Sequence, residues 1–181
     1  MTGGQSCSSN MIVWIPDEKE VFVKGELMST DINKNKFTGQ EEQIGIVHPL
    51  DSTEVSNLVQ VRISDVFPVN PSTFDKVENM SELTHLNEPS VLYNLEKRYD
   101  CDLIYTYSGL FLVAINPYHN LNLYSEDHIN LYHNKHNRLS KSSLDENSHE
   151  KLPPHIFAIA EEAYENLFRI FCLARTGFTS D

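Results

Sequence analysis

Short β-prone runs separated by turn residues fill the first third of the chain. Five runs fit into about 55 residues, and no helical period lies between them. In the last run Val59, Val61 and Ile63 share one face, and the polar residues between them share the other. This pattern predicts a small all-β barrel of SH3-like type over residues 11–65, with a strand meander of a larger domain as the alternative. The runs cover residues 11–15, 21–23, 26–29, 43–47 and 57–63, and the polar residues 1–10 are expected to form a disordered tail.

The remainder of the chain mixes helical and β patterns. Pro89 is a good first residue for a helix of about ten residues that ends near Asp100. Two β-prone runs, 103–107 and 110–115, are joined by Ser108-Gly109, which predicts a hairpin whose second strand is of the buried type. Asn116-Pro117 ends that strand, because proline lacks the amide hydrogen that a sheet needs.

Two further helices are expected. Ser125 is a suitable N-cap for a short helix that carries Ile129 and Leu131. Residues 134–152 are polar and predict a solvated loop. Pro153-Pro154 then opens the most periodic segment of the chain, with one apolar stripe formed by Ile156, Ile159, Ala160, Ala163, Tyr164 and Leu167.

Composition limits the classes of partner. The chain has 26 acidic and 14 basic residues, a net charge of −12, which disfavours binding to a phosphate backbone. The longest apolar run, 110–115, is far shorter than the roughly 18 residues of a membrane span. No secretory signal is visible, and Cys7, Cys101 and Cys172 are widely spaced. We therefore expect a cytoplasmic protein with reduced thiols that binds neither nucleic acid nor membrane.

No catalytic residue or metal ligand is predicted. The 181 residues contain no G-x-x-x-x-G-K-[ST] motif, which is the usual phosphate-binding loop. His128, His133 and His136 are close in sequence, but structural zinc sites combine closely spaced ligand pairs from two segments. Solvated loop histidines are the simpler interpretation.

One polar motif stands at the end of a predicted strand. Asn116, Pro117 and Tyr118 follow the run 110–115, and Tyr124 comes six residues after Tyr118. Ligand pockets in α/β folds favour the carboxyl ends of strands, and an amide with tyrosine rings can hold a planar base. A strand terminator beside core tyrosines explains the same residues without any ligand. Chemistry alone leaves both interpretations open.

Several segments together resemble the amino-terminal part of a myosin motor head. They are VWIPD (13–17), DKVENM (75–80), LTHLNEPSVLYNL (83–95), DLIYTYSG (102–109), FLVAINPY (111–118) and PHIFAIA (154–160). They stand in the family's order and span most of the chain. The front barrel and its opening resemble class II, conventional myosin, of the fungal cytokinetic type.

The resemblance implies a mixed fold. Residues 11–65 would form the SH3-like barrel, and 66–167 the incomplete α/β start of a P-loop-type motor core. Asn116, Pro117, Tyr118 and Tyr124 would line the adenine pocket for MgATP. The intact family uses ATP and Mg²⁺, binds actin filaments and light chains, and works in the cytoskeleton, in the myosin complex of the contractile ring.

The sequence also departs from the family. His119-Asn120 stands where many relatives carry a basic residue, and residues 168–181 match nothing expected. We therefore expect a chain truncated before the phosphate loop, through a change of reading frame or an altered coding end after Leu167. Such a chain would neither hydrolyse ATP nor bind it tightly. The alternatives are an SH3-like interaction module that binds proline-rich segments through Trp14, or a truncated product without function.

Overall fold

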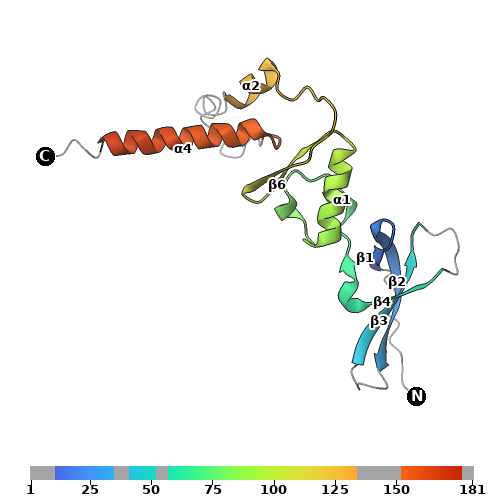
Figure 1. Cartoon of the computed structure of the whole chain (residues 1–181). Coiled ribbons are helices and arrows are strands. Elements are labelled where there is room, and N and C mark those ends of the chain that lie inside the picture. The colour runs from blue at the N-terminus through green and yellow to red at the C-terminus, as the bar shows by residue number, and fades with distance from the viewer. Residues whose placement is uncertain (1–10, 35–40, 52–56, 134–151, 177–181) are drawn as a thin grey trace. The chain divides into compact units, whose positions relative to one another are not determined.

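The structure is a computed structural model that describes residues 11–34, 41–51, 57–133 and 152–176 (Figure 1). The predicted tail 1–10 and residues 134–151 of the predicted loop lie outside these ranges. The chain divides into two compact units, and each is described by itself. Unit 1 comprises residues 1–75 with 83–93, and unit 2 comprises 76–82 with 94–181.

Unit 1 is built on a five-stranded antiparallel sheet with the strand order β4-β3-β2-β1-β5. This sheet, together with the helices of the chain, confirms the mixed fold expected from the sequence. The β-prone runs 21–23 and 26–29 are one strand rather than two. The strands are β1 (Met11–Asp17), β2 (Val21–Lys34), β3 (Glu41–Pro49), β4 (Val59–Arg62) and β5 (Phe67–Pro68).

Gly25 explains why β2 runs through without a turn. It is buried and pairs with Val13 on one side and Pro49 on the other. A Cβ at this position would collide with Val47 Cγ1 and lie 3.1 Å from the carbonyl oxygen of His48. The glycine therefore permits the close approach of β3. In the sequence pattern alone, the same glycine is typical of a turn.

A β-bulge interrupts the pairing of β2 with β3. Leu27 pairs with Val47, and Ser29 pairs with the next residue, Ile46. Met28 is therefore the extra residue on β2, and its side chain is exposed. Beyond the bulge the two strands continue as a long pair to Lys34 and Glu41 (Figure 1).

The core of unit 1 lies on the face of the sheet that alternation predicts. Val13 and Ile15 of β1 pack with Val47 and Val61, and the partly buried Val23, Leu27, Val59 and Val66 surround them. Trp14 points to the opposite face but is only 5% exposed. Its ring centroid lies 5.3 Å from that of Tyr93, and Lys24 Nζ lies 3.9 Å from the Tyr93 centroid and 5.0 Å from that of Trp14. Strand β1 is thus covered on both faces.

Asparagine side chains fix the start of helix α1 (Glu88–Tyr99). Asn87 Oδ1 accepts the Ser90 amide hydrogen at 3.0 Å, so Asn87 is the N-cap, and its Nδ2 donates to the Pro68 carbonyl at 3.1 Å. Asn70 accepts the His85 amide hydrogen at 2.7 Å and donates to the His85 carbonyl at 2.8 Å. The helix predicted from Pro89 is confirmed, and its first half belongs to unit 1.

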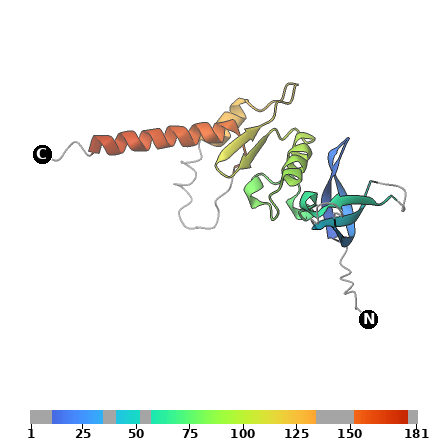
Figure 2. The same cartoon turned by 60° about the horizontal axis from the view of Figure 1, so that its bottom comes forward.

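Unit 2 contains the end of α1, a two-stranded hairpin and two more helices. The hairpin consists of β6 (Tyr105–Ser108) and β7 (Phe111–Ala114), and the helices are α2 (Glu126–His133) and α4 (Ile156–Thr176). Two short 3₁₀ turns, Ile63–Asp65 and Ser72–Phe74, belong to unit 1, and a third, Met80–Glu82, belongs to unit 2. Helix α2 packs beside the first turns of α4 (Figures 1 and 2).

The hairpin forms where the sequence predicts it, with a shifted turn. Ser108 pairs with Phe111, so the turn residues are Gly109 and Leu110, and Gly109 has φ +60°. The prediction that 110–115 is a buried strand is wrong, because Leu110 is 95% exposed and Phe111 is also exposed. Since β7 pairs with β6 in a sheet of two strands, its outer edge has no neighbouring strand among the described residues.

Arg98, near the end of α1, is a buried charge in unit 2. It is 4% exposed, and its guanidinium donates three hydrogen bonds. Nε donates to Thr106 Oγ1 at 2.8 Å, Nη1 to the Lys76 carbonyl at 2.9 Å, and Nη2 to the Tyr105 carbonyl at 2.8 Å. Burial lowers the pKa of Arg98, which Glu78 partly offsets. This one side chain joins α1, β6 and the segment before the third 3₁₀ turn.

The predicted helix after Pro153-Pro154 is confirmed as α4, but its apolar stripe is not a buried face. Ile156, Tyr164 and Leu167 are exposed, and so are Phe168, Ile170 and Phe171 further along. Among the parts of the chain that the structure describes, no helix is both long enough and apolar enough to cross a membrane.

Candidate functional site

The predicted base-binding motif forms a tight turn directly after β7. The Ile115 amide donates to the Ile104 carbonyl at 3.0 Å, which is the last backbone bond of the hairpin. Asn116 Oδ1 then accepts the Tyr118 amide hydrogen at 3.0 Å, an Asx-turn that stops the strand. Tyr118 adopts φ +56°, in the left-handed region that non-glycine residues seldom occupy. Its side chain is 89% exposed, so the turn presents a tyrosine ring to solvent.

The turn is held from the other side by residues at the end of α1. The Pro117 carbonyl accepts a hydrogen bond from the Tyr99 hydroxyl at 3.2 Å. His119 Nδ1 lies 2.7 Å from the same carbonyl, and its Nε2 lies 3.1 Å from Asp102 Oδ1. A carbonyl and a carboxylate both accept, so either ring nitrogen can donate to its partner when it carries hydrogen. Asp102 and His119 are therefore part of the site, although they are absent from the predicted set.

Tyr124 belongs to a different group of side chains. Its hydroxyl lies 2.8 Å from the Tyr105 hydroxyl, and burial, with the Tyr124 contact, raises the pKa of Tyr105 to about 12. Its ring lies near those of His155 and Phe157, with centroids 5.8 and 6.0 Å apart. We call this group the aromatic cluster; its members are Tyr105, Tyr124, His128, Tyr132, His155 and Phe157.

The structure thus brings together three of the four predicted residues. Asn116, Pro117 and Tyr118 share one turn, and Tyr124 lies in the aromatic cluster. Within the described residues no hydrogen bond or ring contact joins the turn to Tyr124. The exposed Tyr118 ring and the exposed Asn116 side chain can contact a planar base.

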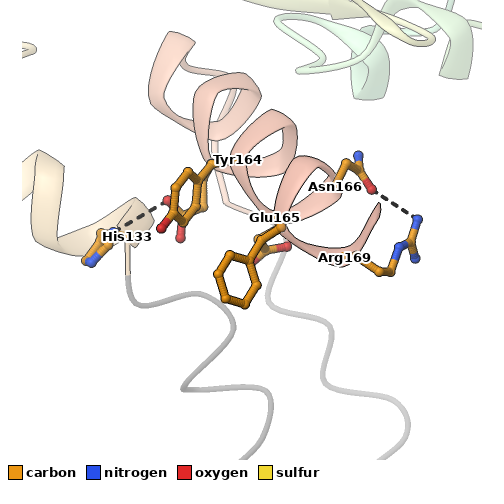
Figure 3. A pocket seen from close by; sticks show the side chains of 7 residues that line it. His133, Tyr164, Glu165, Asn166 and Arg169 are labelled. Atoms are coloured by element: carbon orange, nitrogen blue, oxygen red, sulfur yellow. Dashed lines mark hydrogen bonds and ion pairs between the residues drawn. The ribbon is translucent and has the colours of Figure 1, made fainter. Parts of the chain in front are cut away.

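A hollow of about 530 Å³ lies elsewhere, along α2 and α4 (Figure 3). Between the two helices, His133 Nδ1 of α2 lies 3.5 Å from Glu161 Oε2 of α4. Within α4, Arg169 Nη2 donates a hydrogen bond to Asn166 Oδ1 at 3.1 Å. A second hollow of about 460 Å³ adjoins it and shares His133, Glu161 and Tyr164. None of the four predicted residues lines either hollow.

His155 is the residue that sequence reasoning missed most clearly. It is 3% exposed and stands at the centre of the aromatic cluster, immediately before the first residue of α4. Its position after Pro153-Pro154 marks it as the N-cap, but histidine is not among the usual N-cap residues, so the pattern gave no signal. Tyr132 is equally buried, and its hydroxyl donates to the Pro153 carbonyl at 2.9 Å.

Comparison with known proteins places these features in context. The family model "Myosin head (motor domain)" matches residues 77–170. Myosin-1 of Saccharomyces cerevisiae is 99% identical over 167 residues, which are 92% of this chain and 9% of that protein. Myosin type-2 heavy chain 1 of Schizosaccharomyces pombe is 42% identical over 155 residues, 86% of this chain and 9% of that protein. The chain spans about a tenth of the length of these relatives.

Proposed function

The chain belongs to the myosin head (motor domain) family, and on that basis we propose that it is the amino-terminal part of a type II, actin-based motor driven by ATP. The match across residues 77–170 carries the proposal, because it includes the hairpin, the Asn116 turn and α4 as far as residue 170. The intact motor would bind MgATP and actin filaments, carry light chains, and act in the cytoskeleton during cytokinesis at the contractile ring.

Within that motor, the turn after β7 would contact the adenine base. Asn116 has an amide that can donate and accept, although its Oδ1 already holds the Tyr118 amide. Tyr118 offers an exposed ring for stacking, and Tyr124 offers a second ring from the aromatic cluster. Tyr99 and the His119–Asp102 contact would keep the turn in place before the base arrives.

The 181 residues by themselves supply no phosphate contact of the usual kind, because the G-x-x-x-x-G-K-[ST] motif is absent from them. Phosphoryl transfer in this class depends on that loop, on Mg²⁺ and on residues that position the attacking water. We therefore propose that this chain recognises the base alone and does not hydrolyse ATP.

A titration of the full 181-residue chain with adenosine and with MgATP tests this proposal. Both should shift the amide resonances of Asn116 and Tyr118, with dissociation constants of about 1 mM or weaker. The two affinities should agree within a factor of about three, since only the base is held. Asn116→Ala should abolish the shifts, and Asn166→Ala, an exposed asparagine on α4, should leave them unchanged.

Two outcomes would contradict the proposal. MgATP binding at least tenfold tighter than adenosine would reveal a phosphate site. Steady release of phosphate by the purified chain, retained after further purification, would reveal hydrolysis.

The alternative function is a proline-rich ligand bound through Trp14, and this ring is only 5% exposed among the described residues. Trp14 is buried beneath Tyr93 and Lys24 within unit 1. Its role is packing, so we do not propose a second function.

A further inference from the structure

Two hydrogen bonds fix the tautomer of His155. Its Nδ1 accepts the amide hydrogen of Phe157 at 3.1 Å, and its Nε2 lies 3.0 Å from the carbonyl oxygen of Leu123. A carbonyl only accepts, so Nε2 must carry the hydrogen, and Nδ1 must present its lone pair to the amide. The side chain is therefore a neutral imidazole. It acts as the N-cap of α4, satisfying an amide that has no partner inside the helix.

Among the described residues, the groups packed around the His155 ring are aromatic side chains and carry no negative charge. From α2, His128 and Tyr132 stack on its ring, with centroids 5.9 and 5.0 Å away and interplanar angles of 17° and 21°. The ring of Tyr105, in β6, approaches the His155 ring edge-on, with the two centroids 5.0 Å apart. The centroid of the Tyr124 ring, which precedes α2, lies 5.8 Å from that of His155.

Tyr105 and Tyr132 stay uncharged near neutral pH, and the proximity of His128 opposes a proton on His155. Burial raises the pKa of Tyr105 and of Tyr132 to about 12, so both hydroxyls remain protonated. On the next turn of α4, Glu161 is engaged with His133 of α2. Burial lowers the pKa of His155, the Leu123 hydrogen bond raises it, and the proximity of His128 lowers it further.

A second proton on His155 would damage the structure in two ways. The hydrogen on Nδ1 would point at the amide hydrogen of Phe157, so donor would face donor and the cap would be lost. A positive charge would also stand at the positive end of the dipole of a 21-residue helix. Both effects act on the first turn of α4, which packs on α2 through Phe157 and Tyr132.

We propose that His155 is a proton-sensitive N-cap: its neutral form holds the first turn of α4 against α2, and its protonation releases that turn. The direction of the pH effect on stability follows from the linkage between proton binding and folding. Because the pKa of His155 is lower in the folded than in the unfolded chain, the unfolded chain binds more protons as the pH falls. The stabilisation is complete above the unfolded value of about 6.5 and is lost as the pH falls from there toward the lower folded value.

Amide hydrogen exchange of the full chain between pH 7.5 and about 5 tests the proposal. After correction for intrinsic exchange, the protection factor of the Phe157 amide should fall by up to about tenfold per pH unit below about 6.5. The Ser90 amide is the internal control, because the side chain of Asn87 caps it at the start of α1 and does not titrate. Its protection should stay constant over the same range.

Two variants separate His155 from the other histidines. In His155→Asn the amide oxygen can still accept the Phe157 hydrogen, so protection should persist and lose its pH dependence. His128→Gln removes a repulsive neighbour and should raise the folded pKa of His155, so the loss of protection should end at a higher pH and be smaller in total than in the wild-type chain. The proposal would be overturned if His155→Asn kept the wild-type pH dependence. It would also be overturned if Phe157 and Ser90 lost protection in parallel in the wild-type chain, a result that needs no variant.

Discussion

Ile15→Ala should lower the free energy of unfolding of unit 1 by about 2–5 kcal/mol. Ile15 is 1% exposed and packs with Val13, Val47 and Val61 in the core of the sheet. The substitution removes three buried carbon atoms and leaves a cavity that a paired β-strand cannot readily close. Urea unfolding of the full chain, followed by the fluorescence of its single tryptophan, Trp14, measures the change within the same unit.

Ile32→Ala provides the matched control. It makes the same chemical change on β2, but Ile32 is 65% exposed, so the loss should stay within about 0.5 kcal/mol. Equal losses in the two variants would mean that the four-residue core does not stabilise the sheet.

Arg98→Ala should destabilise unit 2 by about 2–5 kcal/mol. The substitution leaves the Lys76 and Tyr105 carbonyls without their donor in a buried site, and the Thr106 hydroxyl loses its partner as well. Arg98→Lys should recover only part of the loss, because an ammonium group cannot reproduce the planar set of three donors. Thermal unfolding followed by far-ultraviolet circular dichroism measures the change.

Lys97→Ala is the neighbouring control on the same helix turn. Its surface ion pairs with Glu96 and Asp100, at 3.9 and 3.5 Å, are expected to contribute at most about 1 kcal/mol. If Arg98→Ala and Lys97→Ala behaved alike, the hydrogen bonds of Arg98 would be structurally unimportant.

The order of elements could be predicted because it depends on local pattern. Alternation in 57–63, the helix start at Pro89 and the hairpin glycine, Gly109, are each expressed within a few residues, and all three elements are present. The membership of the myosin head family was likewise predicted from motifs and is confirmed. Gly25, in contrast, does not form the turn that its local pattern indicates. This glycine is required because β3, a strand distant in sequence, approaches it closely.

The buried polar residues could not be predicted from pattern. Arg98 follows Lys97 in a charged stretch, and nothing local distinguishes the exposed cation from the buried one. His155 likewise owes its burial to rings supplied from α2 and β6, distant in sequence. In contrast, Asn116 and Tyr118 were predicted together and form one turn, because an Asx-turn is a local structure.

The bulge at Met28 bears on how this chain should be aligned with relatives of different length. Side chains alternate between faces along a strand, so a gap placed at another position of β2 assigns the residues between that position and Met28 to the wrong face. Between Gly25 and Lys34 of β2, Met28 is the one residue that has no paired residue on β3. A relative that is one residue shorter here should therefore be aligned with its deletion at Met28, which keeps Ile32 opposite Gln43 and preserves the correspondence of the outer hairpin.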